Sequence, residues 1–160
     1  MTTRRLWLAA MASGLVAACA QPPRGAPHTE DAWSGRLALL VEDTSAQSFS
    51  AGFELQGNAG RGELALFNPL GNVIARVRWQ PGSATLDDGK QIRRSTSIAA
   101  LTEAIAGSTL PIAALFAWLH GEEAEASGWY ADLSSLPAGR ITATRLAPLP
   151  RAVLRVVFDR

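Results

Sequence analysis

The side chain best placed for chemistry is the thiol of Cys19, the only cysteine in the 160-residue chain. It follows Val16-Ala17-Ala18, and upstream lie two arginines and then a mostly apolar stretch from Leu6 to Ala18. A basic start, a short apolar run and small residues at a cleavage point are the pattern of a secretory signal peptide. The run is shorter than the about 20 residues that a membrane-spanning helix needs. We therefore expect residues 1–18 to be a signal peptide that is removed.

A cysteine directly after two small residues resembles the bacterial lipobox, in which the thiol receives a diacylglycerol and the new amino group is acylated. One acyl chain binds a membrane only marginally, whereas a triacylated Cys19 would carry three. Ala20 follows it, and no aspartate stands there to retain an enteric-type lipoprotein in the inner membrane. The expected location is thus the periplasmic face of the outer membrane. The alternative is an ordinary signal peptide that happens to contain a cysteine.

Catalytic and metal-binding patterns are not found in the rest of the sequence. Of the two histidines, His28 lies in a proline-rich segment and His120 at a predicted helix end, where the helix dipole favours a histidine. No set of histidines and carboxylates has metal-ligand spacing. The segment from Gly82 to Lys90 has six residues between its glycines, not the four of a phosphate-binding loop. We expect neither an enzyme nor a cofactor or metal site.

Composition bounds the domain organisation. Removing residues 1–18 takes away two of the 15 basic residues and none of the 14 acidic ones, so the mature formal charge becomes −1. Such a surface does not indicate a nucleic-acid partner, which needs clustered positive charge. Residues 19–30 are rich in proline and small residues and are expected to form a lipidated tether. Residues 31–160 then form one domain, expected to be monomeric.

Hydrophobic periodicity predicts an α+β fold that is mainly antiparallel β. Ser97 can cap a helix that ends at Gly107, and a second helix starts near Pro111 and closes at Gly121. An open curved sheet or half-barrel covered by helices fits this order. Alternation alone does not say which face of the sheet is concave. The apolar/polar alternation predicts strands at residues 33–41, 49–55, 64–66, 73–79, 128–130, 140–146 and 152–158.

The turn Asn68-Pro69-Leu70-Gly71 places a large apolar side chain where loops usually face water. Two interpretations stay open for Leu70. Either it folds back onto the core, or it is exposed and dips into a membrane.

Together these features resemble the LolB family, outer-membrane lipoproteins that receive other lipoproteins from a periplasmic carrier. The resemblance rests on an ordered set of short stretches, each degenerate alone. They are the lipobox, Trp33-Ser34-Gly35-Arg36-Leu37, Gly62 to Gly71, Leu110-Pro111-Ile112 leading to Leu115, Trp118-Leu119-His120-Gly121 and Gly128-Trp129.

The resemblance implies a half-barrel with a helical lid over an apolar cavity for acyl chains. It implies a LolA-like carrier, cargo lipoproteins and outer-membrane lipid as partners, and a role for Leu70, beside Pro69, in membrane insertion. Two departures stand out. The part after Gly121 is shorter than in the enteric proteins, by about a strand pair, and the usual aromatic ending is replaced by Phe158-Asp159-Arg160.

Two sets of candidate residues follow from the strand and helix phases. Basic pairs on the surface could meet an acidic carrier rim, the alternative being solvated surface: Arg76, Arg78, Arg93 and Arg94. The candidate cavity residues are apolar and in phase: Leu37, Leu39, Phe53, Leu55, Val77, Trp79, Ile105 and Leu115.

The predicted function is to accept lipoproteins from the carrier through their acyl chains and to insert them into the outer membrane. One competitor is a structural or assembly lipoprotein of the envelope, with a filled core and a protein-binding surface. Another is a lipid-anchored carrier for a different apolar ligand.

Overall fold

The computed structural model describes residues 31–42, 47–106, 111–126 and 128–159. The predicted signal peptide, Cys19 and the tether therefore lie outside the described residues. Within the described part of the chain, no helix is long and apolar enough to cross a membrane.

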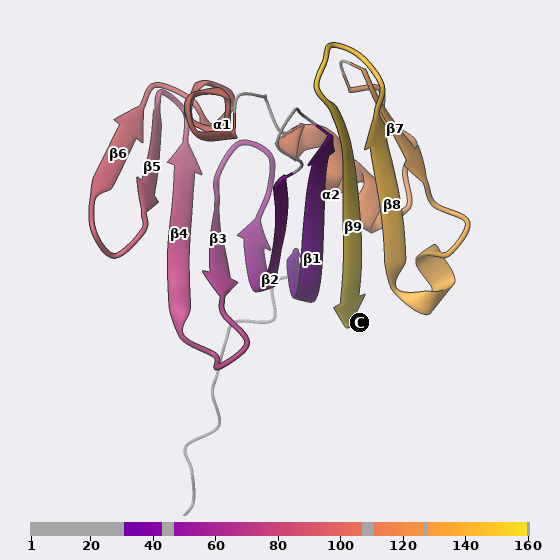
Figure 1. Ribbon diagram of the computed structural model, residues 1–160, viewed down its shortest axis with the longest axis horizontal. Coiled ribbons are helices and arrows are strands. Elements are labelled where there is room, and N and C mark those ends of the chain that lie inside the picture. The colour runs from indigo at the N-terminus through magenta and orange to yellow at the C-terminus, as the bar shows by residue number, and fades with distance from the viewer. Residues whose placement is uncertain (1–30, 43–46, 107–110, 127, 160) are drawn as a thin grey trace, which may run out of the picture.

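A single open antiparallel sheet forms the body of the domain (Figure 1). Its strand order is β6-β5-β4-β3-β2-β1-β9-β8-β7, so the last strand pairs with the first in the middle of the sheet. The edges, β6 and β7, do not pair with each other, and the sheet stays a half-barrel. Its strands are β1 (Ala32–Glu42), β2 (Gln47–Gly57), β3 (Gly62–Phe67), β4 (Val73–Gln80), β5 (Ser83–Asp87), β6 (Ile92–Ser95), β7 (Trp129–Asp132), β8 (Arg140–Arg145) and β9 (Arg151–Asp159).

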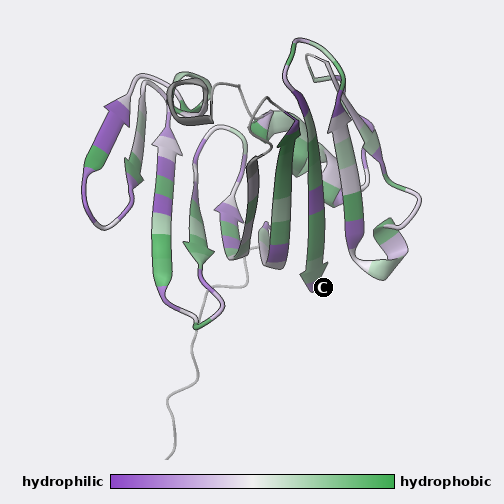
Figure 2. Ribbon diagram, in the orientation of Figure 1, coloured by the Kyte–Doolittle hydropathy of each residue, from purple (hydrophilic) through white to green (hydrophobic). Residues whose placement is uncertain are grey.

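Period-two alternation sets the two faces of the sheet, visible as bands of contrasting hydropathy along β4 (Figure 2). The register carries one apolar row across the strands: Leu37 lies opposite Ala51 and Val156, and Val156 lies opposite Ile141. This face is buried, and the opposite face carries most of the charged side chains.

Close backbone approach explains one glycine in the first strand. A Cβ at Gly35 would collide with the carbonyl oxygen of Val157 on β9. Glycine therefore allows β1 and β9 to pair closely here.

Two helices follow the first six strands. In α1 (Ile98–Ala106) the hydroxyl of Ser97 accepts a hydrogen bond from the N–H of Ala100 at 3.1 Å, which confirms the predicted cap. This helix packs on β5 and β6. α2 (Ile112–His120) ends at Gly121, whose φ of 85° is the left-handed conformation expected at a helix C-terminus. Its N–H donates to the carbonyl of Trp118 at 3.0 Å.

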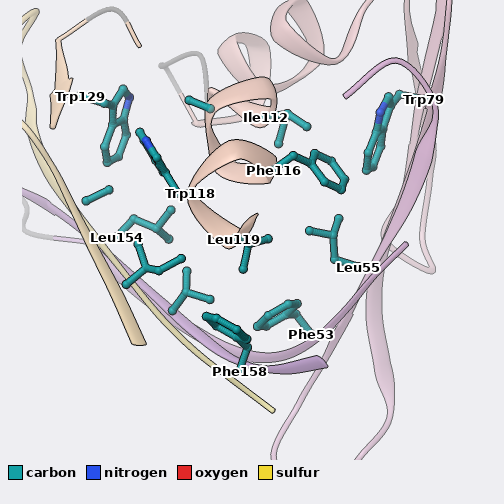
Figure 3. Packing of buried hydrophobic residues seen from close by; sticks show 14 of the residues in the cluster. Phe53, Leu55, Trp79, Ile112, Phe116, Trp118, Leu119, Trp129, Leu154 and Phe158 are labelled. Atoms are coloured by element: carbon teal, nitrogen blue, oxygen red, sulfur yellow. The ribbon is translucent and has the colours of Figure 1, made fainter. Parts of the chain in front are cut away.

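The concave face of the sheet curves around α2 (Figure 3). Five of the nine residues of this helix are buried, so apolar side chains fill the space between helix and sheet. The ring of Trp33 on β1 meets Phe116 edge-on, with ring centroids 5.5 Å apart. Nε2 of His120 lies 3.4 Å from Oδ1 of Asp31. These contacts hold the C-terminal half of α2 against the start of β1.

Sequence periodicity missed three short elements: β5, β6 and the 3-10 turn η1 (Leu136–Ala138). β6 has the sequence Ile-Arg-Arg-Ser, too polar and too short to show an apolar face. It is a strand because its backbone pairs with β5, a tertiary cause that a local pattern does not reveal.

Candidate functional site: an apolar cavity under α2

An apolar cavity of about 120 Å³ lies between α2 and the concave face of the sheet. Side chains from β1, β2, β3, β9 and α2 enclose it, and all of them are apolar. The lining residues are Leu37, Leu39, Phe49, Phe53, Leu55, Leu64, Leu66, Pro111, Ile112, Leu115, Trp118, Leu119, Leu154 and Val156.

Five of the eight predicted cavity residues line this space: Leu37, Leu39, Phe53, Leu55 and Leu115. Val77 and Trp79 do not line it, which corrects their place in the prediction. The ring of Trp79 lies 6.2 Å from that of Phe116, and its Nε1 donates to the carbonyl of Asn58 at 3.0 Å.

Val77 sits on the same sheet face between Leu64 and Leu86, partly buried against the core. β4 is thus part of the packed core beside the cavity. Ile105 belongs to the end of α1, where side chains lie outside the described residues.

Sequence reasoning missed the other nine lining residues. Phe49, Leu64 and Leu66 lie in phase with the predicted strands, so alternation could have found them. Leu154 and Val156 required knowing that β9 pairs with β1. The cavity also required knowing that α2, rather than α1, crosses this part of the sheet (Figure 3).

In this conformation the cavity is small. An engineered protein cavity of about 150 Å³ binds a benzene molecule, so about 120 Å³ accommodates only a few methylene groups. A whole acyl chain would require α2 to move away from the sheet. Phe49 marks the accessible rim, because 41% of it is exposed.

The Asn68-Pro69-Leu70-Gly71 turn joins β3 to β4 at the lower end of the sheet in Figure 1. Oδ1 of Asn68 accepts the N–H groups of Leu70 at 2.9 Å and Asn72 at 3.0 Å, and its carbonyl accepts that of Gly71 at 2.9 Å. These bonds fix the turn and leave Leu70 86% exposed, with Pro69 also exposed. Of the two interpretations left open by the sequence, folding back onto the core is therefore wrong.

Arg76 and Arg78 lie on the convex face of β4 and flank Glu63 of β3. Nε of Arg78 donates to Oε2 of Glu63 at 2.6 Å. Nε of Arg76 lies 3.2 Å from Oε1 without hydrogen-bond geometry, so that pair is an electrostatic contact. The two arginines share one carboxylate and leave a net positive patch.

Arg93 and Arg94 are exposed on β6, opposite Leu86 and Thr85. Successive strand residues point to opposite faces, so these two do not form the single basic cluster that the sequence suggested. Near them, the backbone N–H groups of Gln91 and Lys90 lower the pKa of Asp88, and the charge of Arg93 adds to this effect.

Arg145 is the one charged residue buried in the described part of the chain. Its Nη2 and Nε donate to the carbonyl of Pro150 at 2.8 and 3.2 Å, and its guanidinium lies 5.6 Å from the ring centre of Trp129. Burial lowers the pKa of Arg145. Within the described residues, no group of three or more histidine, cysteine or acidic side chains could hold a metal ion.

The fold and the cavity define a class: open antiparallel half-barrels that enclose an apolar space against a helix. Residues 31–145 match the family model described as outer membrane lipoprotein LolB. Over 185 aligned positions the chain is 34% identical to the outer-membrane lipoprotein LolB of Bordetella petrii, covering 98% of this chain and 92% of the relative. The chain belongs to the LolB family of outer-membrane lipoproteins.

Two further relatives carry the same name. The protein of Thiobacillus denitrificans is 34% identical over 115 residues, covering 69% of this chain and 60% of the relative. The protein of Cupriavidus metallidurans is 33% identical over 133 residues, covering 78% of this chain and 65% of the relative. In these two the match spans less than two thirds of the relative's length. The Bordetella petrii alignment is longer than the 160-residue chain, so that relative carries insertions that this chain lacks.

Proposed function

We propose that this protein accepts lipoproteins from a LolA-like periplasmic carrier, shelters their acyl chains under α2, and inserts them into the outer membrane. Lipid on Cys19 would anchor it there. The observation that supports this best is the cavity, whose 14 lining residues are all apolar. Such a lining suits hydrocarbon and has no polar group to orient a polar ligand.

Hydrophobic burial supplies the energy for each step. A buried methylene is worth about 0.8 kcal/mol, so acyl chains strongly resist exposure to water. A tenfold preference for the receiving site over the carrier requires only about 1.4 kcal/mol. Transfer can therefore run downhill between successive apolar sites without a nucleotide.

α2 would act as the lid. It meets the sheet through side chains, whereas α1 also approaches β5 and β6 closely through its backbone. Moving α2 outward would expose the apolar row of β1, β2 and β9 to the incoming chains. The contacts of Trp33 with Phe116 and of Asp31 with His120 would have to loosen in that step.

Leu70 would serve the last step. Its side chain points into solvent from a turn whose backbone N–H groups are bonded internally, so entering lipid costs little unsatisfied polarity. Leu66, which lines the cavity, stands two residues before Asn68. The turn and the cavity thus adjoin along β3, which suits a path from the cavity to the membrane.

Carrier contact through arginine is the electrostatic part of the proposal. Arg76 and Arg78 present positive charge on the convex face despite Glu63, and Arg93 and Arg94 are exposed on β6. These side chains would attract an acidic carrier surface. The attraction would mainly raise the association rate, and it would weaken as the salt concentration rises.

The small cavity volume favours one alternative, an envelope scaffold with a filled core. A fluorescent fatty-acid probe separates the two. A receptor whose lid opens binds the probe, and Leu66→Phe, which fills the cavity, weakens binding. A packed scaffold does not bind the probe, either as the wild type or as Leu66→Phe.

The decisive experiment is transfer of a labelled lipoprotein from a purified LolA-like carrier to the mature protein, followed by incubation with liposomes. We expect the label to move to the protein and then into lipid. Ile74→Phe, on the convex face, is the matched control for Leu66→Phe and should transfer normally. If the wild-type protein never takes the label from the carrier, the receptor function is wrong.

A further inference from the structure

The loop between β8 and β9, Leu146-Ala147-Pro148-Leu149-Pro150, is a second exposed apolar tip. Leu146 is 61% exposed and Leu149 is 78% exposed, and the residues between them are exposed as well. Single exposed apolar residues are ordinary on a protein surface. Four in succession at the tip of a hairpin are a contiguous apolar surface, of the kind that marks interaction sites.

The structure holds this loop in place from its base. The guanidinium of the buried Arg145 donates twice to the carbonyl of Pro150. The N–H of Leu146 donates to the carbonyl of Gly128 at 3.3 Å. Gly128 has a φ of 76°, and a Cβ there would collide with the carbonyl of Ala147.

Burying an arginine without a carboxylate beside it is unfavourable. Here that arginine fixes a loop whose leucines face solvent. A surface prepared in this way loses little conformational freedom when it binds.

The loop lies at the upper end of the sheet in Figure 1, whereas the Leu70 turn lies at the lower end. The accessible rim of the cavity is nearer the loop. Phe49 lies opposite Leu39, and Leu39 lies opposite Leu154, which is only three residues after Arg151, the first residue of β9. The cavity lining therefore extends from the loop end, at Phe49 and Leu154, toward the Leu70 end, at Leu66.

We infer that the β8–β9 loop docks onto the protein that delivers the acyl chains, by packing Leu146 and Leu149 against the apolar rim of the delivering protein's own lipid site. This inference rests on the proposed function. A protein that carries acyl chains through water must have an apolar mouth, and two apolar tips matched across a junction would keep water away from the passing chains.

The position of the β8–β9 loop favours a protein over a bilayer as its binding partner. With the Leu70 turn in the membrane, the β8–β9 loop points away from it into the periplasm. β9, whose nine residues run from the loop to the lower end of the sheet in Figure 1, spans about 30 Å. One flat membrane cannot meet both tips in this conformation. The tip that faces away from the membrane is the one that an arriving protein reaches.

The test uses the mature lipidated protein with Leu146→Asp and Leu149→Asp together. Val157→Asp, at the end of β9 far from the loop, changes another exposed apolar residue and is the control. Three quantities are measured for each protein: affinity for the unloaded carrier, the rate of lipoprotein transfer from the carrier, and insertion into liposomes from protein preloaded in detergent. Circular dichroism confirms folding, which a change at exposed side chains should leave intact.

We expect the double variant to lose at least tenfold in carrier affinity and transfer rate and to insert preloaded cargo at the wild-type rate, with the control unchanged in all three. The inference is overturned if the wild type accepts cargo and the double variant accepts it equally well, an outcome that leaves the proposed function standing. It is also overturned if the double variant loses liposome insertion while carrier transfer is normal, because the loop would then contact lipid. A wild type that never accepts cargo removes the proposed function and this inference together.

Discussion

Replacing Leu70 by glutamate should separate cargo binding from cargo insertion. Leu70 is 86% exposed, so nearly all of its side chain is free to gain from entering lipid. Full burial of a leucine side chain is worth about 1.5–3 kcal/mol. Losing that contribution corresponds to an about ten- to 150-fold weaker membrane step, and a glutamate adds the cost of bringing a charge to the interface.

The same exposure predicts that the fold tolerates the change. Leu70 contributes little to the core, so the free energy of unfolding should move by no more than about 0.5 kcal/mol. The turn keeps its hydrogen bonds, because those come from the side chain and carbonyl of Asn68 and from backbone N–H groups. Acyl-chain binding in the cavity should be unchanged, since Leu70 does not line it.

The assay loads wild type, Leu70→Glu and Ile92→Glu with a labelled lipoprotein, adds liposomes, and follows the label by flotation. Fluorescent fatty-acid binding and thermal unfolding are measured on the same preparations. We expect normal loading for all three and slow insertion only for Leu70→Glu. Insertion by Leu70→Glu at the rate of Ile92→Glu would refute the role of the turn, and a fall in loading would place Leu70 in cargo binding instead.

Three further predictions concern the packing, the cavity and the response to acid. A Cβ at Gly62 would collide with a backbone carbonyl of β2 and an indole ring of β4, so Gly62→Ala should destabilise by about 1–3 kcal/mol in urea unfolding. Gly60→Ala should change little, because a Cβ there would meet only Oδ1 of Asn58, at 3.4 Å. Leu66→Phe should weaken fatty-acid binding at least fivefold with near-normal thermal stability, and equal binding would mean that lipid sits elsewhere. Backbone hydrogen bonds hold the pKa of Asp88 below its usual 3.8, so its stabilising contribution is present at neutral pH and is lost as pH falls through the folded-state pKa, below about 4. Asp88→Asn should therefore reduce the fall in the free energy of unfolding between pH 5 and pH 2. If the variant loses as much stability in acid as the wild type, this prediction is wrong.

Local sequence was a good guide wherever a residue's partners lie close along the chain. Alternation located seven of the nine described strands, because a strand with one buried face needs an apolar residue at every second position. Helical spacing and end signals located both described helices. Ser97 and Gly121 marked helix ends because capping bonds reach only a few residues. The Asn-Pro-Leu-Gly pattern predicted a turn, and its bonds indeed run within four residues.

The cavity was only partly predictable. Leu37 and Leu55 line it as expected, but Trp79 does not, although it has the same phase. The alternation along a strand shows which face of the sheet a side chain occupies. Which part of that face lies under α2 depends on where the helix crosses, and there Phe116 stands in front of Trp79.

The sequence by itself determined the α+β class, the alternating faces, the turn that carries Leu70 and the membership of the LolB family, since each depends on residue types at short or ordered spacing. The predictions for Cys19 and the tether also come from sequence. Tertiary structure alone decided that β9 lies beside β1, which face is concave, and that α2 encloses an apolar space. It also decided that a buried Arg145 supports the exposed loop of Leu146 and Leu149. The pairing of β1 with β9 joins residues 109 to 125 positions apart, and such pairing depends on how whole faces bury one another rather than on any local pattern.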